Sequence, residues 1–450
     1  MASDGQDVGG RCDGSHSNGA IDEHLASSMQ RLHCNKSPSS SRLENLPAEL
    51  RTMILMSMPD LSTLRSLVHA SPKLHAQYRN SRHSILRACL SSELDGFLVD
   101  AYVTAMSRES VLGPRTDKTI TEHLNCYRSF LSISTSSQNI EIDPDSIRWM
   151  VAYHLSVAQP LARLYSNWAL ATLKKTPLSS TNRQGVATTE RSETALEEGE
   201  SLQEDHDIEL SRSEEIRIFR ALYRYETYHH LFGETHDQHL RRFRSDEIHE
   251  LFFCLFDPWE AEAIGCIGIF IRLGYKDLFG QVKIEWIDGM MACGLETAVQ
   301  LLVITDHEKI LPTIKRCHKR CNPVHVLMSD VFLRFPQDYR REMSPNFPTD
   351  QDVAEQRRDV MQFIGDTVPP DGPPFAWVVL WSGKYSNVYG DFVPWLIREW
   401  GYVMWDERRW VEIGADENLF TRLWETRPDL AELIEQRYIM EEDSESDVGT

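Results

Sequence analysis

The sequence has no hydrophobic run long enough to cross a bilayer. Its longest apolar stretch, Ala263 to Ile271, is well short of the roughly 18 to 20 residues that a membrane-spanning helix needs. The amino terminus carries neither a basic leader nor an apolar core of the kind found in secretory signals. The nine cysteines are scattered and odd in number, so we expect no disulfide framework and a reducing compartment. These absences predict a protein of the cytoplasm, the nucleus or both, with no membrane partner.

Motifs of nucleotide and hydrolase chemistry are also missing. There is no serine nucleophile elbow, no phosphate-binding loop and no His-Glu-x-x-His pair. Ser382-Gly383-Lys384 lacks the upstream glycine of a phosphate loop, and Gly265-Cys266-Ile267-Gly268 has two glycines inside a helical stretch. We interpret both as packing glycines and expect no cofactor. The sequence favours a non-catalytic protein, although catalytic residues that meet only in the folded chain stay open as an alternative.

One short segment has the residue types of a metal site. Cys317-His318-x-x-Cys321 is followed by His325 and supplies three potential zinc ligands. No second cysteine pair stands at a usual spacing, and Lys315, Arg316, Lys319 and Arg320 would repel a cation. The sequence therefore predicts no metal site.

The net charge of −21 is concentrated in two segments. Residues 176 to 215 hold eleven acidic and three basic side chains, and the last ten residues hold five acidic side chains and no basic one. Such a charge argues against binding to nucleic acid or to an anionic membrane. The composition of residues 176–213, which lacks periodicity, predicts a disordered acidic linker.

Hydrophobic positions recur at helical spacing through most of the chain, so we predict a mostly α fold with little β structure. Ala376 to Trp381 is the only β-like candidate, and the charged stretch from Asp352 to Phe363 is predicted to be a surface helix. The expected organisation is a disordered leader (1–42), a three-helix domain (43–90), a helical region (91–175), the acidic linker (176–213), a helical tryptophan-rich domain (214–440) and an acidic tail (441–450).

Tryptophan is concentrated near the carboxy-terminal end. Seven of the eleven tryptophans fall between Trp377 and Trp424. Trp faces stack on sugars, bases and methylated amines, but Trp also dominates burial in helical cores. Without a cage pattern we favour a core role, and a ligand-binding module built on these rings remains the alternative.

The stretch from Leu43 to Tyr78 has the strongest pattern in the chain. A first helix is expected from Asn45-Leu46-Pro47, with Pro47 in its first turn and apolar residues at helical spacing behind it. Pro59 ends that helix, Asp60 can cap the next one, and Ser71-Pro72 starts a third. Three helices this short cannot bury all of their apolar positions, which predicts a partner.

This pattern resembles an F-box, and in particular the F-box of uncharacterised proteins from filamentous fungi. The resemblance rests on Leu46-Pro47-x-Glu49-Leu50, Ile54, Pro59-Asp60-Leu61-x-x-Leu64-x-x-Leu67 and Ser71-Pro72-x-Leu74. Tyr223-Arg224-Tyr225-Glu226, Asp257-Pro258-Trp259-Glu260 and Trp395 to Trp410 resemble later blocks of the same group, to which no function is attached.

The resemblance implies a function in ubiquitin transfer. An F-box binds a Skp-family adaptor and, through it, the cullin of an SCF-type ubiquitin ligase, while the rest of the chain selects a protein substrate. The residues expected to bind the adaptor are Leu46, Pro47, Leu50, Ile54, Leu61, Leu64 and Leu67. A non-degradative F-box scaffold is the alternative closest to this hypothesis.

Overall fold

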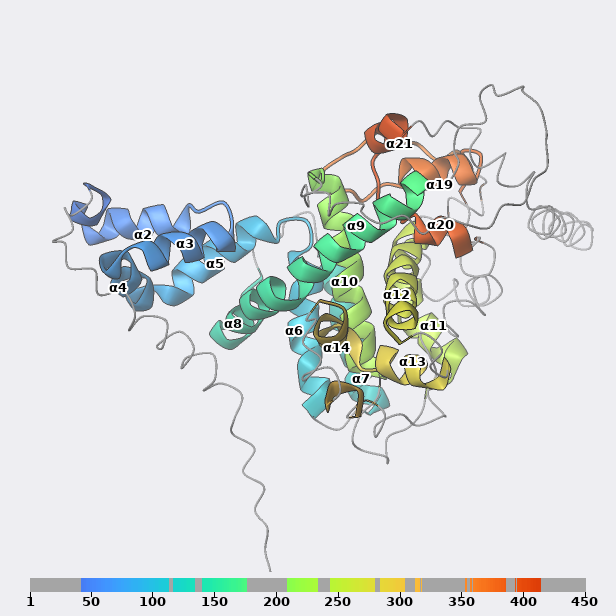
Figure 1. Cartoon of the computed structure of the whole chain (residues 1–450), viewed down its shortest axis with the longest axis horizontal. Helices are drawn as coiled ribbons and strands as arrows, with labels where there is room; N and C mark the ends of the chain where they lie inside the picture. Colours follow the sequence, from blue (N-terminus) through green and yellow to red (C-terminus); the bar gives the residue numbers. More distant parts are fainter. Residues whose placement is uncertain are drawn as a thin grey trace, which may run out of the picture.

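Figure 1 shows a computed structural model of the chain, which describes residues 42–112, 116–133, 140–175, 209–233, 243–279, 284–303, 312–315, 317, 353, 357, 359–385, 393 and 395–413. Helix accounts for 77% of the described residues, and the β pairing among them is an isolated antiparallel bridge between Val360 and Lys384. The predicted mostly α fold is therefore confirmed. No helix in the described part of the chain is long and apolar enough to span a membrane.

Four helices form an amino-terminal bundle that projects from the rest of the molecule (blue in Figure 1). The Asp60 carboxylate accepts a hydrogen bond from the Thr63 N–H at 2.6 Å, and the Ser71 hydroxyl accepts one from the Leu74 N–H at 3.3 Å. Both predicted caps are therefore present, whereas Pro47 lies just before the first helix rather than in its first turn. The elements are η1 (Arg42–Asn45), α2 (Ala48–Met56), α3 (Leu61–Ala70), α4 (Pro72–Asn80) and α5 (Arg82–Glu93).

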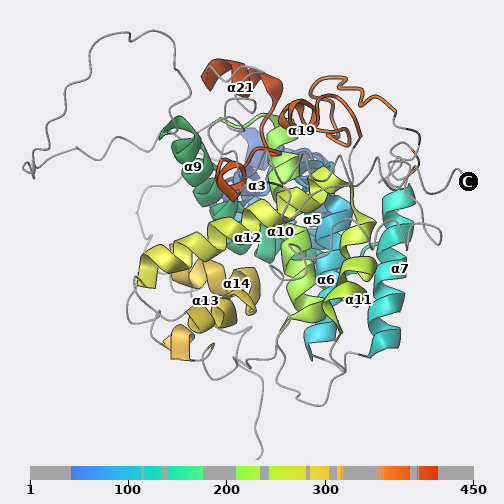
Figure 2. The same cartoon turned by 90° about the vertical axis from the view of Figure 1, so that its right-hand side faces the viewer.

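The remaining helices form a larger body around α10 (Arg212–Phe232), which packs against α6, α9, α12 and α14. In Figure 2, α12 crosses in front of α10, and α6 and α7 lie to the right of α10. The body comprises α6 (Leu98–Leu112), α7 (Asp117–Ile133), α8 (Pro144–Tyr153), the π-helical turn η3 (His154–Ala158), α9 (Gln159–Lys175), α11 (Ser245–Leu251), η4 (Phe253–Leu255), α12 (Pro258–Phe279), α13 (Ile284–Met291), α14 (Gly294–Ala298), the π-helical turn η5 (Val299–Val303), α19 (Phe375–Leu380), α20 (Trp395–Glu399) and α21 (Glu407–Ile413).

Local sequence explains where α10 begins. The Ser211 hydroxyl accepts a hydrogen bond from the Glu214 N–H at 3.2 Å, and the Glu214 carboxylate accepts one from the Ser211 N–H at 3.0 Å. This capping box satisfies two backbone donors that a helix start leaves unpaired. The helix thus begins at Arg212, one residue before the expected end of the linker at 213, and the part of that linker before Glu209 lies outside the described residues.

Buried ion pairs fasten distant helices to one another. The Arg224 guanidinium on α10 contacts Asp100 of α6 at 2.8 Å and Glu260 of α12 at 2.9 Å. Arg398 of α20 binds the fully buried Glu262 of α12 with two nitrogens, at 2.8 and 2.9 Å. Charges this deeply buried persist only when they are paired, so these contacts fix which helix faces meet.

The helical region 91–175 and the domain 214–440 share one core. The cluster of buried apolar side chains is continuous from Leu55 in α2 to Trp410 in α21. In the described part of the chain these two regions pack against each other, with α10 on α6 and α9 and with α12 on α9. The expected boundary at residue 90 falls three residues before the end of α5 at Glu93, whose carboxylate accepts a hydrogen bond from Gln159 of the body.

One local prediction was wrong, and a second was wrong over its last residues. Ala376–Trp381 is not a strand: residues Phe375–Leu380 form α19, whose Ala376, Trp377 and Leu380 are buried. Of the helix predicted over 352–363, Val353 is helical and residues 359–363 are not; there the Met361 N–H donates to the Gly383 carbonyl at 2.8 Å. A short run of apolar residues has neither the helical nor the alternating strand period. Because α19 is buried on several sides, its sequence is such a run, and the pattern could not distinguish a helix from a strand.

Candidate functional site

The outer face of α2 exposes a row of apolar side chains. Leu50, Met53 and Met56 have exposed fractions of 44%, 63% and 38%, and the preceding Pro47 is also exposed. Leu55, on the opposite side of the helix, is fully buried in the bundle. Spacings of three residues place the exposed side chains on neighbouring turns of one helix face.

Hydrogen bonds hold α2 in this orientation. Arg51 donates to the Glu44 carbonyl at 3.0 Å, the Gln77 side chain of α4 donates to the Thr52 hydroxyl at 2.8 Å, and the Cys89 thiol of α5 donates to the Leu55 carbonyl at 3.2 Å. These contacts come from both neighbours of α2. The exposed apolar face is consequently part of a fixed surface rather than of a loosely attached helix.

The seven residues expected to bind an adaptor divide into three groups. Pro47 and Leu50 are exposed on or beside α2. Leu46, Ile54 and Leu67 are half-buried. Leu61 and Leu64 are buried inside the bundle, so we correct their placement on a contact face: they hold α3 against its neighbours.

The structure adds Met53 and Met56 to the exposed face, which the expected set of binding residues omitted. Met53 follows Leu50 by three residues, and that spacing was available in the sequence. The sequence could not show which side of an apolar helix faces the bundle, because α2 carries apolar residues on both sides.

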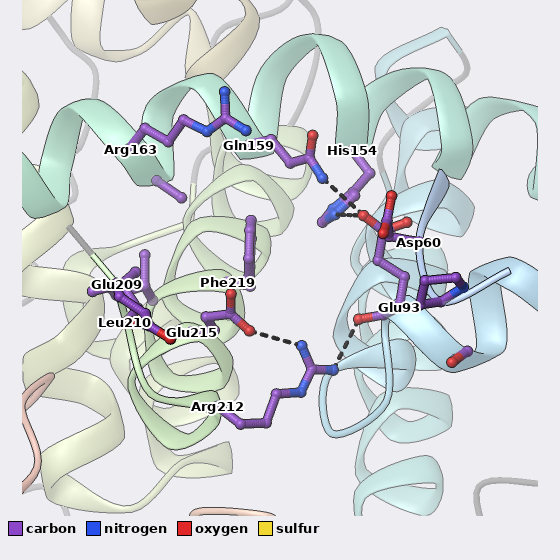
Figure 3. A pocket seen from close by; sticks show the side chains of 14 residues that line it. Asp60, Glu93, His154, Gln159, Arg163, Glu209, Leu210, Arg212, Glu215 and Phe219 are labelled. Carbon is purple, nitrogen blue, oxygen red and sulfur yellow. Dashed lines mark hydrogen bonds and ion pairs between the residues drawn. The ribbon is translucent and has the colours of Figure 1, made fainter. Parts of the chain in front are cut away.

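A second feature lies where the bundle meets the body. A pocket of about 540 Å³ opens between the ends of α3 and α5 on one side and η3, α9 and α10 on the other (Figure 3). Its volume is within the range of roughly 300 to 1,000 Å³ typical of ligand sites. The pocket is lined by Pro59, Asp60, Ser92, Glu93, His154, Gln159, Ala162, Arg163, Glu209, Leu210, Arg212, Glu215, Ile218 and Phe219.

Glu93 is the hub of this pocket's polar contacts. One carboxylate oxygen accepts hydrogen bonds from the Gln159 amide at 2.8 Å and lies 3.2 Å from His154 Nε2. The other accepts the Leu61 N–H at the start of α3, also at 2.8 Å. Glu93 thus connects the bundle to the body through two hydrogen bonds and its contact with His154.

His154 is held from behind by a tyrosine. Its Nδ1 lies 2.9 Å from the Tyr223 hydroxyl of α10. Burial first, and then the charge of Glu93, raise the pKa of Tyr223 well above its usual range, so this hydroxyl keeps its proton. His154 therefore links Glu93 to α10, with one ring nitrogen beside each of the two side chains.

Arg212 closes the lower side of the pocket. It donates to the backbone carbonyls of Glu93 and Asp95 at 2.9 and 2.7 Å and to the Glu215 carboxylate at 3.0 Å. Arg163 and Glu209, at the rim, are exposed and form no side-chain ion pair or hydrogen bond within the described part of the chain.

Three side chains elsewhere have the order of a catalytic triad. The Ser107 hydroxyl lies 2.8 Å from His230 Nδ1, and His230 Nε2 lies 3.3 Å from Glu226. Ser107 has no exposed surface and donates to the Thr104 carbonyl, while Glu226 also accepts the Leu295 N–H at 2.6 Å. This arrangement is a buried polar network that ties α6 and α14 to α10, since no substrate could reach Ser107 in this conformation.

The other candidate sites of the sequence have mixed outcomes. Trp377, Trp381, Trp400, Trp405 and Trp410 are buried, which confirms the core role for these tryptophans, while Trp395 is exposed and Trp424 lies outside the described residues. Of the metal-like segment only Cys317 is described, and it is buried. Gly265 and Gly268 are buried within α12, as expected of packing glycines.

The chain was compared with models of protein families, with curated proteins and with solved structures, and none of the three comparisons found a match.

Proposed function

We propose that this chain is an F-box substrate-recognition subunit of an SCF-type ubiquitin ligase. Its amino-terminal bundle binds a Skp-family adaptor, which connects it to a cullin, and its helical body holds a protein client. The chain itself makes and breaks no bond. It acts by raising the effective concentration of the client near the ubiquitin-charged enzyme, in the cytoplasm or the nucleus.

The observation that carries this proposal is the exposed apolar face of α2. Three large apolar side chains, Leu50, Met53 and Met56, stand on one face of a helix in a bundle that projects from the body (Figure 1). Contiguous exposed apolar surface on a rigid element is typical of a protein-binding surface. The F-box pattern in the sequence covers this helix, so pattern and exposure support the same partner.

The structure refines which residues we assign to the contact. Pro47, Leu50, Met53 and Met56 form the proposed contact face. Leu46, Ile54 and Leu67 are half-buried and stay outside this face, and Leu61 and Leu64 act indirectly by holding α3 in place.

Co-purification with wild-type and Leu50→Asp protein tests the proposal. An aspartate at this position would bury an unpaired charge in the adaptor interface, and the adaptor and the cullin should both be lost from the purified sample. Val411→Asp is the matched control, because Val411 is 66% exposed on α21 of the body. A circular dichroism spectrum equal to that of the wild type shows that each variant is folded.

Retention of the adaptor by folded Leu50→Asp protein would contradict the proposed interface. Absence of the adaptor from the wild-type sample would contradict the proposed function. The half-life of co-purifying proteins after deletion of the gene separates a degradative subunit from a scaffold, since a scaffold leaves those half-lives unchanged.

A further inference from the structure

The pocket between the bundle and the body has a buried carboxylate on its wall. The Glu93 side chain is 10% exposed and that of His154 is 1% exposed. The Glu93 carboxylate accepts hydrogen bonds from the Gln159 amide and the Leu61 N–H, and His154 Nε2 lies 3.2 Å from it. No lysine or arginine side chain forms an ion pair with the Glu93 carboxylate in the described part of the chain. A buried carboxylate that has no lysine or arginine partner favours a cation beside it.

The charged side chains around the opening are also mostly negative. Arg212 is already paired with Glu215 and held by two carbonyls. The other guanidinium, that of Arg163, is exposed, and the carboxylates of Asp60, Glu93 and Glu209 form no ion pair with an arginine in the described part of the chain. The carboxylates that line the pocket are Asp60, Glu93, Glu209 and Glu215, and the cations are Arg163 and Arg212. An anionic ligand would have to approach against this excess of negative charge, whereas a cationic ligand is attracted by it.

The middle of the pocket offers an apolar surface to a flexible stem. Figure 3 shows Phe219 standing between Glu215 and the pair of Glu93 and His154. Its ring stacks on Phe97, with centroids 4.9 Å apart and planes at 18°, and it also contacts the His154 ring. The ring is therefore fixed before any ligand arrives. Aliphatic stems of long cationic side chains pack well on such a surface while the charged head reaches a carboxylate.

We propose that this pocket binds a guanidinium or ammonium group carried on an aliphatic stem, as in an arginine or lysine side chain of a peptide. Glu93 binds the cationic head, and Phe219 packs against the stem. Glu209 and Arg163 set the field at the opening, the first favouring the ligand and the second opposing it. If the function proposed above holds, the peptide belongs to the client, and this part of the inference rests on that function. The cation site itself does not depend on it.

The test measures peptide binding to the purified full-length chain without any adaptor. The probes are a fluorescent, end-blocked pentapeptide with a central arginine and the same peptide with citrulline, which has the same shape without the charge. We expect the arginine peptide to bind saturably and at least about tenfold more tightly, as a charge-assisted hydrogen bond predicts. Its affinity should fall as the salt concentration rises. Unlabelled N-acetyl-arginine amide as competitor shows whether a single side chain suffices or whether the peptide backbone contributes.

Two rim variants determine the sign of the ligand's charge. Glu209→Gln should weaken binding of the arginine peptide about two- to fivefold, and Arg163→Gln should strengthen it by a similar factor. Glu93→Gln keeps the shape and should weaken binding at least about tenfold. Glu93 also joins the bundle to the body. If the Glu93→Gln protein is unfolded, the variants at the two exposed rim positions decide the test.

Equal binding of the arginine and citrulline peptides would overturn the proposal, as would the absence of saturable binding by either. If Arg163→Gln weakened binding and Glu209→Gln strengthened it, the pocket would be assigned to an anion instead. Because no adaptor is present, a failure here is separate from a failure of the adaptor interface.

Discussion

Asp366 makes the stability of this protein depend on pH in a way that one substitution should remove. It lies in the segment before α19, and its carboxylate is 4.0 Å from an Arg217 nitrogen that belongs to a guanidinium already paired with Asp406 at 2.7 Å. Burial, and then the charge and hydrogen bond of Asp406, raise the pKa of Asp366 from 3.8 to about 6. Arg217 and the Glu407 N–H act in the opposite direction without cancelling these effects.

The direction of the pH effect follows from proton linkage. An acid whose pKa is raised on folding binds its proton more tightly in the folded chain. The favourable contribution of protonated Asp366 is complete below the unfolded pKa of about 4 and is lost as the pH rises through about 6. A difference of about two in pKa corresponds to at most about 3 kcal/mol. Because 27% of the side chain is exposed, we discount this to about 1 to 2 kcal/mol for solvent screening.

Asp366→Asn should therefore stabilise the protein at pH 7.5 by about 1 to 2 kcal/mol, since the amide donates to Asp406 without a charge. The expected rise in Tm is about 2 to 6 °C at pH 7.5, and close to zero at pH 4. Thermal unfolding followed by circular dichroism at both pH values measures it. Asp371→Asn, on the same segment, removes a mostly exposed pair with Arg220 and should give no stabilisation. An equal effect of Asp366→Asn at both pH values, or a lower Tm at pH 7.5, would refute the reasoning.

Two further predictions concern the packing of the body, and thermal unfolding checks both. Arg398→Met leaves the fully buried Glu262 without its guanidinium and should cost about 3 to 5 kcal/mol, while the double variant with Glu262→Gln should recover a large part of that loss. Full stability of the single variant would contradict this. Gly401→Ala should cost about 1 to 3 kcal/mol, because Gly401 has a φ of +66° and an added Cβ would lie 2.5 Å from the Tyr165 hydroxyl. An unchanged Tm would show that the turn can adjust.

The sequence predicted those parts of the fold that depend on neighbouring residues. Asp60 and Ser71 cap their helices as expected, because a capping side chain bonds to a backbone group three residues away. The mostly α fold likewise follows from periodicity within each helix. The extended segment around Met361 depends instead on a backbone partner at Gly383, which no local pattern contains.

The candidate sites were predictable to different degrees. The pattern from Leu46 to Leu67 identified the helices that carry the exposed face, but not that Leu61 and Leu64 are buried while Met53 is exposed. The pocket was not predictable, since Glu93 and His154 have no motif between them and meet only when α5 packs against η3. The excess of carboxylates in the pocket likewise arises only when the helices pack together, because these side chains come from separate elements.

The central claim, that the outer face of α2 binds a Skp-family adaptor, is tested most directly by titrating the purified adaptor into the full-length chain in a calorimeter. We predict a single site with a Kd near or below about 1 μM, as expected for a specific protein interface of ordinary size. Met53→Asp should weaken the affinity at least about 30-fold by placing a charge in the interface, and Val411→Asp should leave it unchanged. No heat of binding with the wild-type chain, or equal affinities for wild type and Met53→Asp, would contradict the account.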